Sequence, residues 1–121
     1  MYITVLLILA ATPSLDAIDD ANLALTTCGY SAYREADGQD QPLSQFEQTL
    51  ESRCAGQLAQ LRELAVQFNL GRKGLSQGAA ENAADGLLAD FRAGLISQYS
   101  QRDKLKAQIE TLDRAMREEE K

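Results

Sequence analysis

Apolar residues in the first third of the chain recur at alternating intervals of three and four positions. Such spacing places them along one face of an α-helix. Aspartates at 16, 19 and 20 precede or open this pattern, and acidic residues favour the N-terminal end of a helix. The spacing predicts a helix over about residues 16–36, with Gly29 as a candidate kink point. Its apolar face consists of Ile18, Ala21, Leu25, Cys28 and Ala32.

A second segment with the same spacing follows a polar loop that contains Gly38 and Pro42. Ser44 lies three residues before Glu47, which is the spacing of a capping box at a helix N-terminus. Glycines at 71 and 74 end the pattern, as is usual at a helix C-terminus. The segment predicts one helix over about residues 45–70, capped by Ser44. Its apolar face consists of Phe46, Leu50, Cys54, Leu58, Leu61, Ala65 and Phe68.

The remaining residues predict a third helix over about 76–119. Its first half is rich in small residues, whereas its second half is a charged amphipathic tail over about residues 100–121. At about 1.5 Å per residue this helix would be roughly 65 Å long, against about 39 Å and 30 Å for the others. Part of it must therefore overhang or bend back, with Gly94 and Ser97 as candidate bend points. The apolar positions of the tail are Leu105, Ile109, Leu112 and Met116.

These three segments predict an all-α fold: an antiparallel helical hairpin with one long C-terminal helix, resembling a three-helix bundle. β-branched residues are scarce after residue 17, and the good helix formers Ala, Leu, Gln, Glu and Arg dominate,. A length of 121 residues allows one small domain,. We assign this helical domain to residues 18–121.

Residues 1–17 have the features of a secretory signal. Residues 3–11 are an apolar run of the length found in signal peptides, and Pro13 interrupts any continuing helix,. No Lys or Arg precedes the run, and Ala11 and Ala17 are both only tolerable cleavage positions. A lipid-facing anchor and a buried N-terminal element are the alternatives. The interpretation predicts a periplasmic or secreted protein with no stable membrane span after cleavage.

Two cysteines lie on the apolar faces of the first two predicted helices. Cys28 is about 12 Å, and Cys54 about 15 Å, from the turn of an antiparallel hairpin. The spacing therefore predicts a Cys28–Cys54 disulfide, with free buried thiols and a redox-active pair as alternatives. Closing this loop would contribute about 3–4 kcal/mol to stability. Export and the even number of cysteines support each other, because disulfides persist in the oxidising compartments to which exported proteins are sent.

Composition argues against several classes of function. With 12 Lys+Arg against 18 Asp+Glu, the net charge is −6, which does not suit nucleic-acid binding,. The chain has no histidine, which is the most common general base and transition-metal ligand,. We therefore expect no catalytic residues, no metal site and no cofactor.

Two groups of residues are candidates for weak partner binding. One is an aromatic and basic cluster near the cysteines, and the other is the apolar stripe of the tail, through which the protein would bind a protein partner or self-associate. Aromatic and Arg side chains are enriched at binding hot spots. We expect a non-enzymatic interaction or structural module of the bacterial envelope. A small-ligand binder with a pocket between helices is the alternative, and a thiol redox protein a less favoured one. The candidates are Tyr30, Tyr33, Arg34, Arg53, Leu105, Ile109, Leu112 and Met116.

Overall fold

The computed structural model describes residues 12–120 of the chain, and these residues form four helices connected by short loops. Residues 1–11, the larger part of the signal-like segment predicted over residues 1–17, lie outside the described residues. The end of that segment is described, and there Ser14 caps α2 and Leu15 begins it, three residues before the predicted domain start at residue 18. The described part contains no strand, so the predicted all-α class is confirmed. The helices are α2 (Leu15–Gly38), α3 (Leu43–Arg53), α4 (Ala55–Gly71) and α5 (Gln77–Glu119).

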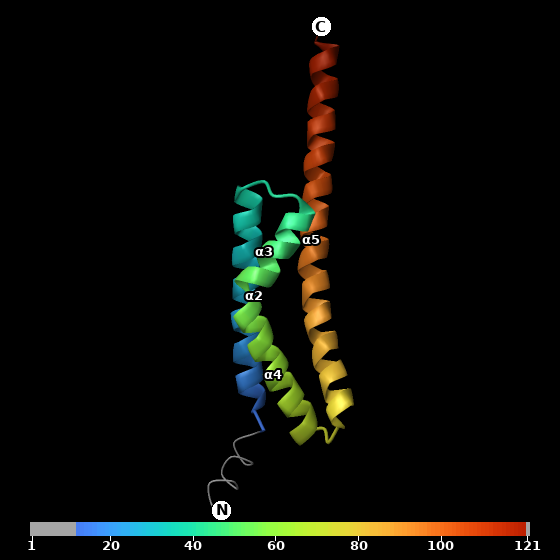
Figure 1. Ribbon diagram of the computed structural model, residues 1–121. Coiled ribbons are helices and arrows are strands. Elements are labelled where there is room, and N and C mark those ends of the chain that lie inside the picture. The colour runs from blue at the N-terminus through green and yellow to red at the C-terminus, as the bar shows by residue number, and fades with distance from the viewer. Residues whose placement is uncertain (1–11, 121) are drawn as a thin grey trace, which may run out of the picture.

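The helices form three antiparallel arms (Figure 1). α2 runs in one direction, α3 and α4 together return, and α5 runs back alongside both. Ser14 caps α2 by accepting a hydrogen bond from the Ala17 amide, and Ser76 caps α5 by accepting one from the Ala79 amide. These caps satisfy amide groups that have no partner within the helix.

The middle arm differs from the sequence prediction, because two helices replace the single helix expected over 45–70. α3 ends at Arg53 and α4 begins at Ala55, with Cys54 between them in a non-helical conformation (φ −105°, ψ 14°). The resulting elbow lies against α2 in Figure 1, while the outer ends of α3 and α4 lean towards α5. A straight helix would not contact both neighbouring arms in this way.

The predicted capping box at Ser44 was wrong. α3 begins at Leu43, with Pro42 at its N-cap position and no side-chain cap. Ser44 and Glu47 consequently lie inside the helix. Pro42 has no side-chain acceptor for the amides of the first turn, but its backbone carbonyl oxygen accepts the first hydrogen bonds of the helix, from the amides of Gln45 and Phe46,.

The core lies where all three arms meet. Its largest fully buried side chains are those of Tyr99, Phe46, Leu25, Leu50, Leu61 and Cys54. A smaller cluster of Ala65, Val66, Ala80 and Ala84 lies between α4 and the start of α5. The small side chains of this cluster allow α4 and α5 to approach closely, as expected from the small residues in the first half of α5.

α5 is continuous over 43 residues, and neither Gly94 nor Ser97 interrupts it. At about 1.5 Å per residue it is roughly 64 Å long, so its C-terminal part projects beyond the other arms (Figure 1). Gly29 does not interrupt α2 either. Within residues 12–120, no helix is both long enough and apolar enough to cross a membrane.

Candidate interaction site

The projecting part of α5 carries a stripe of four large apolar side chains that no described residue covers. Leu105, Ile109, Leu112 and Met116 are between 57% and 65% exposed. Their spacing of four, three and four residues places them on one face of the helix. We call these four residues the α5 stripe. Every residue from Ala107 to Glu120 is exposed, so no part of the described chain buries this segment.

The root of the projecting segment is fixed to the last turn of α2 and to the loop between α2 and α3. Arg102 donates hydrogen bonds to the Asp37 carboxylate and, at 3.3 Å, to the Asp37 backbone carbonyl oxygen. It also pairs with Asp40, as does Lys106 one turn later. The guanidinium of Arg102 lies 5.2 Å from the centroid of the Tyr99 ring, in a cation–π arrangement,. These contacts set the position from which α5 leaves the bundle.

Tyr99 connects the same loop to the core. Its side chain is fully buried, and its hydroxyl donates a 2.5 Å hydrogen bond to the backbone carbonyl oxygen of Gln41. The ring stacks on Phe46, with centroids 4.3 Å apart, and meets Tyr33 edge to face at 5.2 Å. Burial raises the pKa of the Tyr99 hydroxyl, which keeps it protonated and able to donate,.

Asp40 supplies the electrostatic part of this attachment. The hydrogen bond from Lys106 lowers the pKa of the Asp40 carboxyl below its usual value, although desolvation acts in the opposite direction,. The Asp40 backbone has a positive φ of 53°. Aspartate is one of the few non-glycine residues that tolerate this left-handed conformation. Asp40 therefore combines the chain reversal of the loop with a contact to α5.

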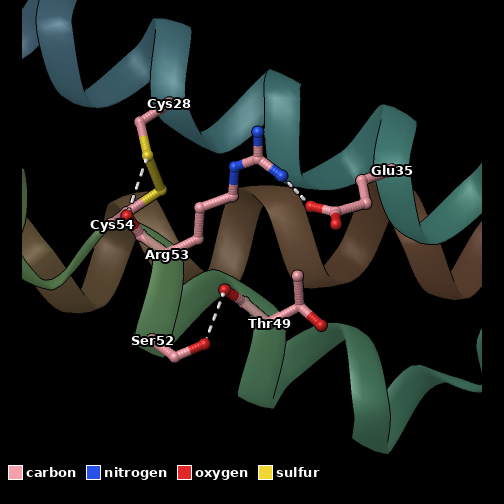
Figure 2. Close-up of a disulfide and its surroundings, with 6 residues drawn as sticks. All are labelled: Cys28, Glu35, Thr49, Ser52, Arg53 and Cys54. Carbon is pink, nitrogen blue, oxygen red and sulfur yellow. Dashed lines mark hydrogen bonds and ion pairs between the residues drawn. A yellow bond between two sulfur atoms is a disulfide. The ribbon is translucent and has the colours of Figure 1, made fainter.

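Cys28 and Cys54 form the predicted pair, as a disulfide that joins α2 to the elbow between α3 and α4 (Figure 2). Their Cα atoms are 5.9 Å apart, within the range that a disulfide requires,. Cys54 is fully buried, and Cys28 is partly buried. The bond therefore lies at the point where the middle arm bends towards α2.

The aromatic and basic candidates near the disulfide do not converge on one surface. Tyr33 packs edge to face against Phe46 in the core, whereas Tyr30 is 45% exposed and Arg34 is exposed. Figure 2 shows Arg53 reaching back to α2, where it forms an ion pair with Glu35. Arg53 thus has a partner within the chain.

The contacts of Tyr99 and Arg102 are the features that sequence reasoning missed. Arg102 interrupts the apolar spacing of the tail, and that interruption was the available signal. A charged residue between an apolar helix face and an apolar tail marks the level at which the helix leaves the bundle. Its matching partners are Asp37 in the last turn of α2 and Asp40 in the loop that follows.

The hollows on the described part of the molecule lie on its surface. Asp40, Pro42 and Lys106 line one beside the root of the projecting segment, and Gln108 and Leu112 line a more apolar one on the segment itself. The space between the helices is filled by the Ala, Leu and aromatic side chains of the core. This packing does not resemble the preformed cavity that typically holds a small ligand.

No protein-family model, curated protein or solved structure matches this chain. The class that the fold defines is a small all-helical protein with a disulfide between two of its arms and one helix that projects from the bundle.

Proposed function

We propose that this protein is a non-enzymatic interaction module of the bacterial envelope that binds its partners through the projecting part of α5. The observation that carries the proposal is the exposed α5 stripe, on a segment that no described residue buries. Contiguous exposed apolar side chains flanked by polar ones are typical of protein interaction sites.

The energetics of the projecting segment support this function. Residues 107–119 are about three and a half turns of helix, and helices shorter than about 12–15 residues are marginal in water when nothing packs against them. The i,i+4 ion pair between Asp113 and Arg117, at 2.9 Å, contributes only a few tenths of a kcal/mol,. Covering the stripe with a partner would bury apolar surface and stabilise the helix at the same time.

The root contacts give the stripe a defined direction. Arg102 and Lys106 hold α5 to the α2–α3 loop, so a partner meets a helix that extends from a packed bundle. Presenting a helix from a rigid scaffold reduces the conformational entropy lost on binding. This arrangement supports a docking role better than a catalytic one.

The interaction proposal is tested by substituting the stripe and, separately, the opposite face of the same segment. The first variant carries Ile109→Asp and Leu112→Asp, and the matched control carries Ala107→Asp and Thr111→Asp. Both add two charges, and all four positions are exposed. We expect the stripe variant to lose its complexes in envelope cross-linking and sedimentation, while the control retains them. Complexes that survive the stripe variant unchanged would refute the role of the stripe.

Export is proposed from the signal-like segment and the disulfide together. Cleavage after Ala11 would leave the Ser14 cap of α2 intact, and it would keep Thr12, whose side chain packs closely against Gly71. Cleavage after Ala17 would remove this cap and the first turn of α2. We therefore expect a mature chain that begins at Thr12.

Intact mass after thiol alkylation without reductant tests export. Loss of residues 1–11 with no alkyl adduct would support export with a closed disulfide. A full-length chain carrying two adducts would contradict both, and partners would then have to be sought in the cytosol.

A further inference from the structure

We propose that the partner of the α5 stripe is the same stripe in a second copy of this chain, paired antiparallel. This inference rests on the proposed function and specifies its occupant. The pairing forms a two-fold symmetric contact between two projecting helices, with a bundle at each outer end.

The order of side chains along the stripe suits such a pairing. With the two-fold axis between Glu110 and Thr111, Leu105 lies opposite Met116 of the second copy, and Ile109 lies opposite Leu112. Each layer then contains two large apolar side chains that are more than half exposed in the single chain. A contact in which the same patch serves both copies is the most common arrangement in dimers.

Charge determines the antiparallel direction. Glu118, Glu119 and Glu120 follow the stripe at its C-terminal end, whereas Lys106 lies at its N-terminal end beside Arg102. A parallel pair would place the two acidic runs side by side. An antiparallel pair separates them by most of the length of the stripe, which removes this repulsion.

The residues beside the stripe agree with this direction. On one side, heptad geometry brings Lys106 of one copy close to Asp113 of the other, and the symmetry repeats this contact. On the other side the flanking residues Gln101, Gln108 and Ala115 are uncharged, so no like charges oppose each other there. The stripe is thus complementary to itself in both its apolar and its charged positions.

The dimer is expected to be weak. The stripe covers two heptads, whereas stable coiled coils normally need three or four. The bundles lie at opposite ends of the paired segment, so the two bundles do not contact each other. We expect a monomer–dimer equilibrium with a midpoint between about 1 μM and 1 mM.

Sedimentation equilibrium of the purified oxidised chain up to about 1 mM tests the pairing. Asp113→Lys replaces both cross-helix attractions with repulsions and should weaken the dimer about 5- to 30-fold. Asp90→Lys makes the same charge change at an exposed position of α5, about 35 Å along the helix from Asp113, and should change the affinity less than about two-fold,. Asp113 is preferred to Lys106 as the test position, because Lys106 also holds Asp40.

Cysteine cross-linking tests the direction. In an antiparallel pair, a mixture of Leu105→Cys and Met116→Cys chains forms mixed cross-links faster than either variant forms cross-links with itself. In a parallel pair, Met116→Cys cross-links rapidly with itself, which would overturn the inference.

The two proposals fail in different ways. A wild-type chain that stays monomeric at about 1 mM, or equal dimerisation of Asp113→Lys and wild type, overturns self-pairing. If the envelope complexes still depend on Ile109 and Leu112 in that case, the interaction function stands with a different protein as the partner. If the wild-type chain stays monomeric and the envelope complexes no longer depend on Ile109 and Leu112, both proposals are overturned.

Discussion

At the residue scale, two side chains decide how α5 meets the other arms. Tyr99 donates a buried hydrogen bond to the Gln41 carbonyl oxygen. Gly29 lies where α2 crosses α5: a Cβ atom there would lie 2.6 Å from Leu95 Cδ1 and 2.8 Å from Phe91 Cζ. Position 99 therefore needs a hydrogen-bond donor, whereas position 29 has no room for a side chain.

Tyr99→Phe should lower the free energy of unfolding by about 1–2 kcal/mol, because the Gln41 carbonyl would lose its partner in a buried site. Tyr30→Phe is the control, since Tyr30 is exposed and its substitution should stay within about 0.5 kcal/mol of wild type,. Urea unfolding followed by circular dichroism measures both. Equal stability of the two variants would mean that water replaces the Tyr99 hydroxyl.

Gly29→Ala should destabilise the protein by about 1 kcal/mol, although alanine is the better helix former. The added methyl group would force Leu95, which is buried, to move within a packed core,. Gly94→Ala is the matched control, because nothing lies within 4 Å of its Cβ position. That variant should gain about 0.5–1 kcal/mol. Thermal unfolding that ranks Gly29→Ala above Gly94→Ala would contradict the close approach.

At the element scale, the attachment between α5 and the 37–42 loop is electrostatic as well as apolar. Arg102 and Lys106 both contact Asp40, whose side chain is exposed. Exposed ion pairs are individually weak and are screened by salt. Their role here is to orient the projecting segment more than to stabilise the fold.

The stability of wild type relative to Asp40→Asn should depend on pH. The lowered pKa of Asp40 means that its contribution is fully present above about pH 5 and is lost as pH falls below 3.8 towards the folded-state pKa,. Asparagine tolerates the positive φ at this position, so the backbone need not change. Urea unfolding from pH 7 to pH 3 measures the difference in the free energy of unfolding between wild type and Asp40→Asn. This difference should become smaller towards pH 3, and added salt should reduce it at pH 7. A difference independent of pH would exclude the carboxylate as its cause.

At the scale of the whole molecule, the disulfide joins two arms at the elbow of the middle one. A domain of about 100 residues buries a modest core, so one cross-link is a large fraction of its stability. The bond also holds the bend at Cys54 against α2, which lets α3 and α4 contact both neighbouring arms.

Reduction should lower the free energy of unfolding by about 2–4 kcal/mol, because the unfolded chain regains the freedom of a closed loop. Urea unfolding with and without reductant measures this effect. A variant with Cys28→Ser and Cys54→Ser is the control and should not respond to reductant. If wild type also fails to respond, the cysteines are free thiols in the purified protein.

The sequence by itself determined the helical class, the four helix termini of the first and last arms to within about two residues, and the pairing of the cysteines. These follow from local information: apolar spacing, serine and glycine at helix ends, and the heights of Cys28 and Cys54 in a hairpin. The exposed α5 stripe was also readable, because length alone required part of the last helix to overhang or bend back.

Only the tertiary structure decided the elbow at Cys54, the straight course of α5 and the contacts of Tyr99 and Arg102. The apolar pattern runs through Cys54 without interruption, so nothing local marks a break there. The break arises because the middle arm packs against α2 at its elbow and against α5 towards its two outer ends. Likewise, Arg102 meets Asp37 across 65 residues of chain, and a contact of that separation is set by how the arms pack and not by the residues near either partner.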